Sequence, residues 1–489
     1  MNGKTGPESS RIAPPVLDRI SILAGTNRPD LRSCLSGWNA ARGVIPGGWI
    51  SIFIFLPVLS GSAQEALQNM QAGSTAADAR SQQMQSSQSQ DYTFKKGDFR
   101  LMVMPSLGLQ FNDNINLAQT NVMDDFIVTP AVGITASYPW SERNLLYLDI
   151  TVGYDWYLMH PQFSSFELNS SSGTGLSFDF GIKDVTINLH DRINYTQGAG
   201  QTGSGASGAN INGSGTASAY TANSVNGSVA NTATYGTFQN TAGLSGSWDL
   251  NQVKLSLGYD HQNIIATSGQ FDDISHSSEM VFFRPGLQLN PKVTVGLEAT
   301  AAFTTYEQNV LNDNDAYTLG PYLELRPDQA LSISIKGGYT INKFQNTSST
   351  IQTASQNSWY ADLNIAHQPT EAVSYSIDAG REVQLGVVSD LLEDWYVRPN
   401  ITWKVVKGLD IFTFLFFEHG DQGVGSTGSV PGNSNGTFDW YGGGFSLQHA
   451  LTSWLALSLN YRLTLRSSGA PNDSYTQNLI ALELTYHTK

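Results

Sequence analysis

The chain has 489 residues, of which 40% are hydrophobic and only 14% are charged, and it contains 47 glycines. Its mean hydropathy of −0.21 excludes a bundle of apolar transmembrane helices. The net charge of −15 argues against nucleic acid as a partner, because a phosphate backbone is bound by basic surfaces.

The first 63 residues have the pattern of a targeting segment. Trp49 to Leu59 form an apolar run that follows Arg42 and precedes the small residues Gly61-Ser62-Ala63. This order predicts that residues 1–63 are an N-terminal extension and a secretory signal peptide, cleaved before the mature chain. The run has about eleven residues, which is too short to span a bilayer. A buried core segment is the alternative.

A second pattern begins near residue 99, after a polar stretch at 64–97 that is rich in Gln, Ser and Ala. Apolar and polar residues then alternate with a period of two, which places them on opposite faces of β-strands. Each segment has about ten residues, enough for a tilted strand to cross a bilayer. About eighteen segments show the alternation: 99–111, 125–138, 145–157, 174–182, 185–195, 236–248, 253–262, 279–289, 293–306, 315–325, 331–342, 357–367, 373–383, 394–404, 409–418, 438–448, 455–465 and 475–486.

The connections between these segments also alternate. Short turns follow the even-numbered segments, whereas long connections follow most odd-numbered ones, and the longest, 196–235, is almost entirely Gly, Ala, Ser, Asn and Thr. An even strand number with short turns on one side and long loops on the other predicts an all-β, transmembrane, antiparallel up-and-down barrel of about eighteen strands over 98–489. Both termini and the 64–97 lead-in would be periplasmic. A soluble β-sandwich or propeller is the alternative.

The two faces of the predicted strands differ in chemistry. Trp and Tyr gather near the ends of the apolar face, as in the interfacial girdles of outer-membrane barrels. Charge is costly toward lipid, so the opposite face is predicted to line a water-filled pore. The pore-lining candidates are Arg100, Asp149, Asp179, Arg192, Lys254, Arg284, Glu298, Glu324, Lys336, Asp362, Asp378, Arg398, Arg462 and Glu483. These carry both signs in similar number, so the sign of ion preference stays open.

Prolines and glycines occur inside the predicted strands. Because proline removes a donor from the ladder, the prolines are expected to mark bulges or register positions. Inward glycines, Gly258 among them, are expected to let lumen side chains pack across them. The in-strand prolines are Pro105, Pro130, Pro285, Pro321 and Pro399.

No motif predicts catalysis, a cofactor or a metal site. Gly198 to Gly203 matches G-x-G-x-x-G, but no helix follows to receive a pyrophosphate. His190 is expected in the wall or rim. Asp313-Asn314-Asp315 starts like a calcium loop without its glycine and final glutamate. Acidic outer loops are interpreted as solvated surface, with divalent-cation bridging to lipopolysaccharide as the alternative; their other residues are Asp124, Asp125, Asp272, Asp273, Glu393 and Asp394.

Phe111-Asn112-Asp113-Asn114-Ile115-Asn116-Leu117, followed by Val128-Thr129-Pro130-Ala131-Val132-Gly133, resembles the β-barrel porin type 2 family. The resemblance extends loosely over 98–489. It implies a barrel and a channel, with similar proteins found beside exopolysaccharide export systems, and it brings no catalytic residues.

The favoured hypothesis is therefore a porin-like outer-membrane channel for passive diffusion of small polar solutes or passage of saccharide. The alternative is a structural or interaction barrel that acts as a partner in an exopolysaccharide export or surface-assembly system, with the 196–235 loop as its binding surface or plug. A barrel enzyme ranks third. Expected partners are outer-membrane lipid, lipopolysaccharide and the barrel-assembly machinery, with exopolysaccharide or export components under the alternative.

Overall fold

The computed structural model describes residues 92–141, 143–169, 175–196, 236–267, 269–349, 351–386, 389–423, 426–427, 436–469 and 474–486. The described residues all belong to one compact unit, residues 59–489. The predicted signal peptide, most of the lead-in, Gly198 to Gly203 and the loop at 197–235 lie outside the described residues. No helix of the described part is long and apolar enough to cross a membrane.

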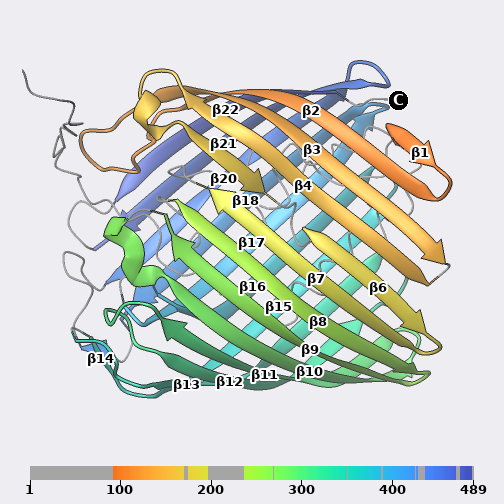
Figure 1. Cartoon of the computed structure of the whole chain (residues 1–489), viewed down its shortest axis with the longest axis vertical. Helices are drawn as coiled ribbons and strands as arrows, with labels where there is room; N and C mark the ends of the chain where they lie inside the picture. The colour runs from red at the N-terminus through yellow and green to blue at the C-terminus, as the bar shows by residue number, and fades with distance from the viewer. Residues whose placement is uncertain are drawn as a thin grey trace, which may run out of the picture. The chain divides into compact units, whose positions relative to one another are not determined.

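Most described residues lie in one antiparallel sheet of twenty strand segments (Figure 1). Two further segments, β14 (Gln352–Thr353) and β19 (Ser426–Thr427), pair with each other, and η1 (Pro161–Phe163) and η3 (Gly269–Ile274) are short 3-10 helices. The first strands of the sheet are β1 (Phe94–Lys96), β2 (Phe99–Asn112), β3 (Asp125–Ser141), β4 (Asn144–Tyr157), β5 (Ser165–Asn169), β6 (Leu176–Ile182), β7 (Val185–Thr196), β8 (Thr237–Leu250) and β9 (Val253–Ala266). The others are β10 (His276–Asn290), β11 (Val293–Tyr306), β12 (Asn314–Leu325), β13 (Leu331–Phe344), β15 (Gln356–Thr370), β16 (Val373–Leu385), β17 (Leu391–Val406), β18 (Leu409–Gln422), β20 (Thr437–Ala450), β21 (Leu455–Ser468) and β22 (Tyr475–Tyr486).

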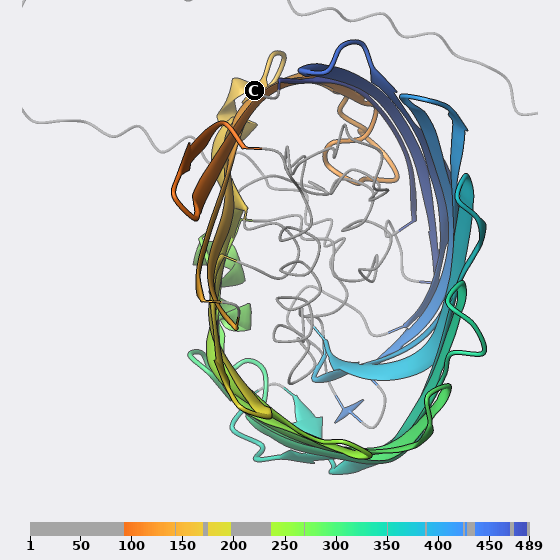
Figure 2. The same ribbon diagram turned by 90° about the vertical axis from the view of Figure 1, so that its right-hand side faces the viewer.

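The sheet closes on itself because β2 pairs with both β3 and β22, and Figure 2 shows the resulting ring. β1 is a short addition to β2, and β5 and β6 share one place between β4 and β7. The ring therefore has eighteen strand positions, all antiparallel, and the predicted fold class is confirmed. The orientation of the termini across a membrane stays a prediction.

The two faces of the ring have the predicted chemistry. On β3, Phe126 and Tyr138 are 45% and 40% exposed, whereas Ile127 and Ala131, on the other face, are 1% and 6% exposed. The exposed apolar side chains form the outer face and the covered, mostly polar ones the inner face. Tryptophans at 395 and 403 stand on the outer face of β17. The eight residues from one tryptophan to the other rise about 20 Å along the barrel axis, at about 3.3 Å per residue and a strand tilt of about 40°. This rise is close to the height of the apolar band of outer-membrane barrels.

The turns agree with the predicted alternation of loop lengths. Short connections such as Asn251-Gln252 and Lys407-Gly408 follow the even-numbered positions of the ring. Asn251 and Gly408 have φ of 67° and 82°, the left-handed conformation that tight hairpins use. Tyr486 pairs with Leu455, beside one of these turns, so the described chain ends at the short-turn end of the ring.

The in-strand prolines do not shift the register, which corrects the expectation for them. At Pro285, Pro321 and Pro399 the pairing with one neighbouring strand is interrupted. The same number of residues is left unpaired on both strands, so the register is unchanged after the interruption. The recorded shifts lie near the short turns, for example between Gln288 and Asn290. A missing N–H removes a bond but adds no residue, and only an added residue produces a bulge.

Two boundaries differ from the predicted ones. The fourth strand, predicted at 174–182, is two segments, β5 and β6, that continue along the same place in the ring. Glu393 and Asp394, predicted in an acidic outer loop, belong to β17, which starts at Leu391. Leu391-Leu392-Glu393-Asp394 has two apolar residues followed by two charged ones, so the apolar–polar alternation did not predict the start of this strand.

The joint between the first and last strands is shorter than the others. β2 pairs with β22 only from Ser106 to Asn112, and the ladder stops next to Pro105, which has no N–H to donate. β1 pairs with residues 99–101 of β2, beyond the end of β22. This short strand covers part of an edge that would otherwise be free.

Candidate permeation wall

All fourteen predicted pore-lining residues lie on the inner face of the ring. The register shows this directly, since Asp149 pairs with Thr135 on the face that also carries buried Ile127 and Ala131. The remaining thirteen follow by the same cross-strand relations: Arg100, Asp179, Arg192, Lys254, Arg284, Glu298, Glu324, Lys336, Asp362, Asp378, Arg398, Arg462 and Glu483. That they line a conducting pore stays a prediction.

One part of the inner wall, from β11 to β16, is rich in carboxylates. We call it the carboxylate arc; it consists of Glu298, Glu324, Asp362, Asp378 and Glu382. Next to it on β10, Arg284 lies 2.9 Å from Glu324 and 3.7 Å from Glu298, and its guanidinium stacks 4.1 Å from the Tyr322 ring. On β13, Lys336 is directly opposite Asp362.

The neighbouring part, from β17 to β21, combines arginines with aromatic rings. We call it the arginine–ring arc; it consists of Arg398, Arg462 and Arg466 with Tyr396, Phe412, Phe414, Phe416, Phe438 and Trp440. Arg398 lies 2.8 Å from Glu418 and 3.7 Å from Asp378. Its guanidinium also stacks 4.2 Å from the Tyr396 ring. The Tyr396 hydroxyl donates a 2.7 Å hydrogen bond to Asp362 and so connects the two arcs.

Glycines make room for these rings. Phe414 and Phe416 are stacked, with ring centres 6.4 Å apart, and they pair across the ladder with Gly444 and Gly442. A Cβ at Gly442 would lie 2.8 Å from the Phe416 ring and 2.1 Å from the Leu463 carbonyl oxygen. The rings therefore lie flat against the wall. The expectation for Gly258 is confirmed in the same way, because the Phe282 ring covers it.

A buried polar bridge crosses strand β8. His190 on β7 is 2.8 Å from Asp260 on β9 through Nε2 and 2.8 Å from the Asn188 side-chain oxygen through Nδ1. Gly243 on β8 lies between, and a Cβ there would be 2.2 Å from Asp260. The Asn188 amide donates to Asp179, so this predicted residue belongs to the same bridge. His190 lies in the wall, as predicted, and the bridge is a structural link between strands.

Several inner-wall charges were missed by the sequence reasoning. They share the period-two position of the predicted residues, which is the signal that would have found them. On β18 the run before Glu418 is apolar on both faces, so the inward side of that strand was ambiguous. The missed residues are Asp155, Glu167, Asp260, Glu382, Asp394, Glu418 and Arg466.

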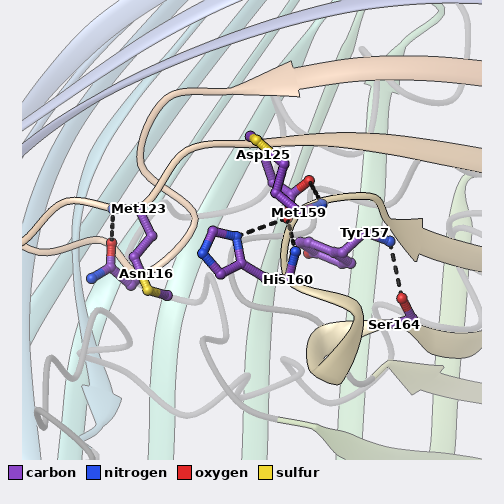
Figure 3. Close-up of polar contacts among 7 residues, drawn as sticks. All are labelled: Asn116, Met123, Asp125, Tyr157, Met159, His160 and Ser164. Carbon is purple, nitrogen blue, oxygen red and sulfur yellow. Dashed lines mark hydrogen bonds and ion pairs between the residues drawn. The ribbon is translucent and has the colours of Figure 1, made fainter.

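Hydrogen bonds hold the loops at the end of the ring opposite the short turns, and Figure 3 shows these bonds for two neighbouring loops. Asp125 accepts hydrogen bonds from the backbone N–H of Met159 and of His160, at 2.9 and 2.8 Å. The His160 ring nitrogen Nδ1 lies 3.0 Å from the same carboxylate. Asn116 and Met123 close the preceding loop. Asp125 is fully buried, so it is a structural residue and not part of a solvated acidic surface.

A second set of loops packs around Asp390. Its carboxylate accepts hydrogen bonds from the Asn312 backbone and side chain, at 2.9 and 2.7 Å, and from Thr353. Burial in the nearby η3 raises the pKa of Asp273. Asp313 accepts a hydrogen bond from the Tyr306 backbone, so the calcium-like sequence serves loop closure. The described residues contain no group of three or more His, Cys, Asp or Glu side chains that could hold a metal.

No family model and no curated protein matches the sequence. OccK2 (OpdF) of Pseudomonas aeruginosa in complex with glucuronate is 9% identical with a TM-score of 0.43, covering 82% of this chain and 100% of that one. A BenF-like porin from Pseudomonas fluorescens Pf-5 is 8% identical with a TM-score of 0.43, covering 80% and 99%. Acinetobacter baumannii OccAB3 is 9% identical with a TM-score of 0.41, covering 79% and 98%.

At such identities and TM-scores these likenesses decide nothing about the fold or the solute of this chain. The barrel implied by the β-barrel porin type 2 resemblance is confirmed by the structure itself. Membership of that family and the link to exopolysaccharide export stay predictions.

Proposed function

We propose that the protein is an outer-membrane channel through which small polar solutes diffuse. The observation that supports this is the closed ring of eighteen strand positions with an apolar, exposed outer face and a charged inner face. A soluble sandwich would place its apolar faces against each other, whereas here they point outward. Barrels of this strand number enclose enough space for an aqueous lumen.

The outer face fits a lipid environment. Side chains such as Leu257 and Leu319 are 56% and 60% exposed, a cost in water that hydrocarbon removes. Outer-membrane lipid and lipopolysaccharide would cover this band, and the barrel-assembly machinery would insert it. The sequence offers no catalytic motif, so we propose a channel and not an enzyme.

Planar-bilayer recording tests the proposal. Folded protein is identified by the altered electrophoretic mobility of an unheated sample, and it is then added to a painted bilayer in KCl. Stepwise conductance is the expected result, and boiled protein is the control. Folded protein that inserts but carries no current overturns the proposal.

A further inference from the structure

We propose, on the basis of the channel function above, that the pore prefers cationic solutes over anionic ones. The preference would belong to the wall as a whole and not to one binding site. It follows from which charged side chains of the inner face remain in contact with water and which are covered.

The carboxylates of the carboxylate arc reach water. The side chains of Glu298 and Asp378 are each 21% exposed, and that of Glu324 is 31% exposed. Asp362 is also partly exposed. Over the same strands, β11 to β16, Lys336 is the single inward cation of the described residues.

The cations of the neighbouring arc are covered. Arg398, Arg462 and Arg466 are 5%, 7% and 4% exposed. Arg398 is neutralised by Glu418, which is itself completely buried. The other two stack on rings: Arg462 lies 5.6 Å from Phe416, and Arg466 lies near the rings of Phe438 and Trp440. A solute in the lumen therefore meets carboxylates more readily than guanidinium groups.

The rest of the inner face does not reverse this imbalance. Partly exposed Arg100 and Arg192 are balanced by partly exposed Asp179 and Glu483. Lys254 is 59% exposed, but it stands at the short-turn end of the barrel, 3.8 Å from Asp249. Arg284 is held by two carboxylates of the arc.

Fixed negative charge in a narrow, low-dielectric passage raises the local concentration of cations and lowers that of anions. The effect extends over about 10 Å at 0.1 M salt, the Debye length, and fades as salt is raised.

Reversal potentials in a KCl gradient measure the preference. At about 0.1 M salt the potassium-to-chloride permeability ratio should be about threefold or more, and it should fall toward unity at about 1 M. The double variant Glu298→Gln with Asp378→Asn should lower the ratio about twofold. Each nearby arginine keeps a carboxylate in this variant, because Arg284 retains Glu324 and Arg398 retains Glu418.

The matched control removes the same charge from the outer face. Glu279 and Asp439 are 46% and 45% exposed there, and Glu279→Gln with Asp439→Asn should leave the ratio unchanged. Liposome swelling adds a solute test, in which L-lysine should enter faster than L-glutamate.

The outcomes separate the two proposals. The cation preference is overturned if the conductance shows no preference or favours chloride. It is also overturned if the inner and outer double variants change the permeability ratio equally. Either result leaves the channel proposal standing. Absence of conductance from folded, inserted protein overturns the channel and the preference together.

Discussion

The carboxylate arc and the arginine–ring arc are neighbours on one face of one sheet, yet they treat charge in opposite ways. The first leaves Glu298 and Glu324 in contact with water. The second buries Arg398 and Glu418 together and lays phenylalanine rings over Gly442 and Gly444. The inner face of this barrel is therefore part channel lining and part packed core. Substitutions in the second region should change stability, and substitutions in the first should change permeation.

The largest expected effect comes from breaking the buried pair. Arg398→Met removes the guanidinium that neutralises the fully buried Glu418 carboxylate, which should lower the free energy of unfolding by about 3 to 5 kcal/mol. Urea unfolding in detergent micelles, followed by tryptophan fluorescence, measures the loss. The double variant Arg398→Met with Glu418→Gln should recover most of it. If the single variant is as stable as the unchanged protein, the pair is not buried as described.

A smaller loss is expected from filling the space under a ring. Gly442→Val would place atoms against the Phe416 ring and the Leu463 carbonyl, and overpacking of this kind costs about 1 to 3 kcal/mol. The same unfolding measurement applies. Gly246→Val is the control, since nothing lies within 4 Å of a Cβ at that position. Equal losses for both variants would contradict the role assigned to the ring–glycine packing.

The smallest effect on stability is expected in the carboxylate arc. Glu298→Gln should change the free energy of unfolding by less than about 0.5 kcal/mol, because the carboxylate is partly solvated and Arg284 keeps Glu324. Unfolding midpoints compared with those of Gly442→Val test this directly. A loss as large as that of Arg398→Met would mean that the two arcs do not differ.

The fold was largely predictable because a barrel strand needs only alternation, and β3 shows it in consecutive residues from Phe126 to Tyr138. The inner face was predictable where one side of a strand is clearly apolar. It was not predictable on β18, where Phe412, Phe414 and Phe416 face inward and Phe417 faces outward, so both sides read as apolar. Which side faces inward depends on the glycines of the neighbouring strand β20. The sequence of β18 alone does not contain this information.

The side-chain contacts between strands and between loops were harder to predict than the strands themselves. His190 and Asp260 lie 70 residues apart, and their contact requires Gly243 on the strand between them. Likewise, Asp390 was not singled out, although it connects loops that start after different strands. Such contacts depend on which strands and loops become neighbours in the folded barrel. This is decided by the order and tilt of the strands in three dimensions.

The short joint between β2 and β22 has a consequence for assembly. Asp113 accepts hydrogen bonds from the backbone and side chain of Asn478, at 2.6 and 2.7 Å, across 365 positions of sequence. These bonds can form only after the last strand has been delivered, so the chain must be held as an open sheet until then. The residues near the start that resembled a family signature thus help to set the alignment of the final closing step.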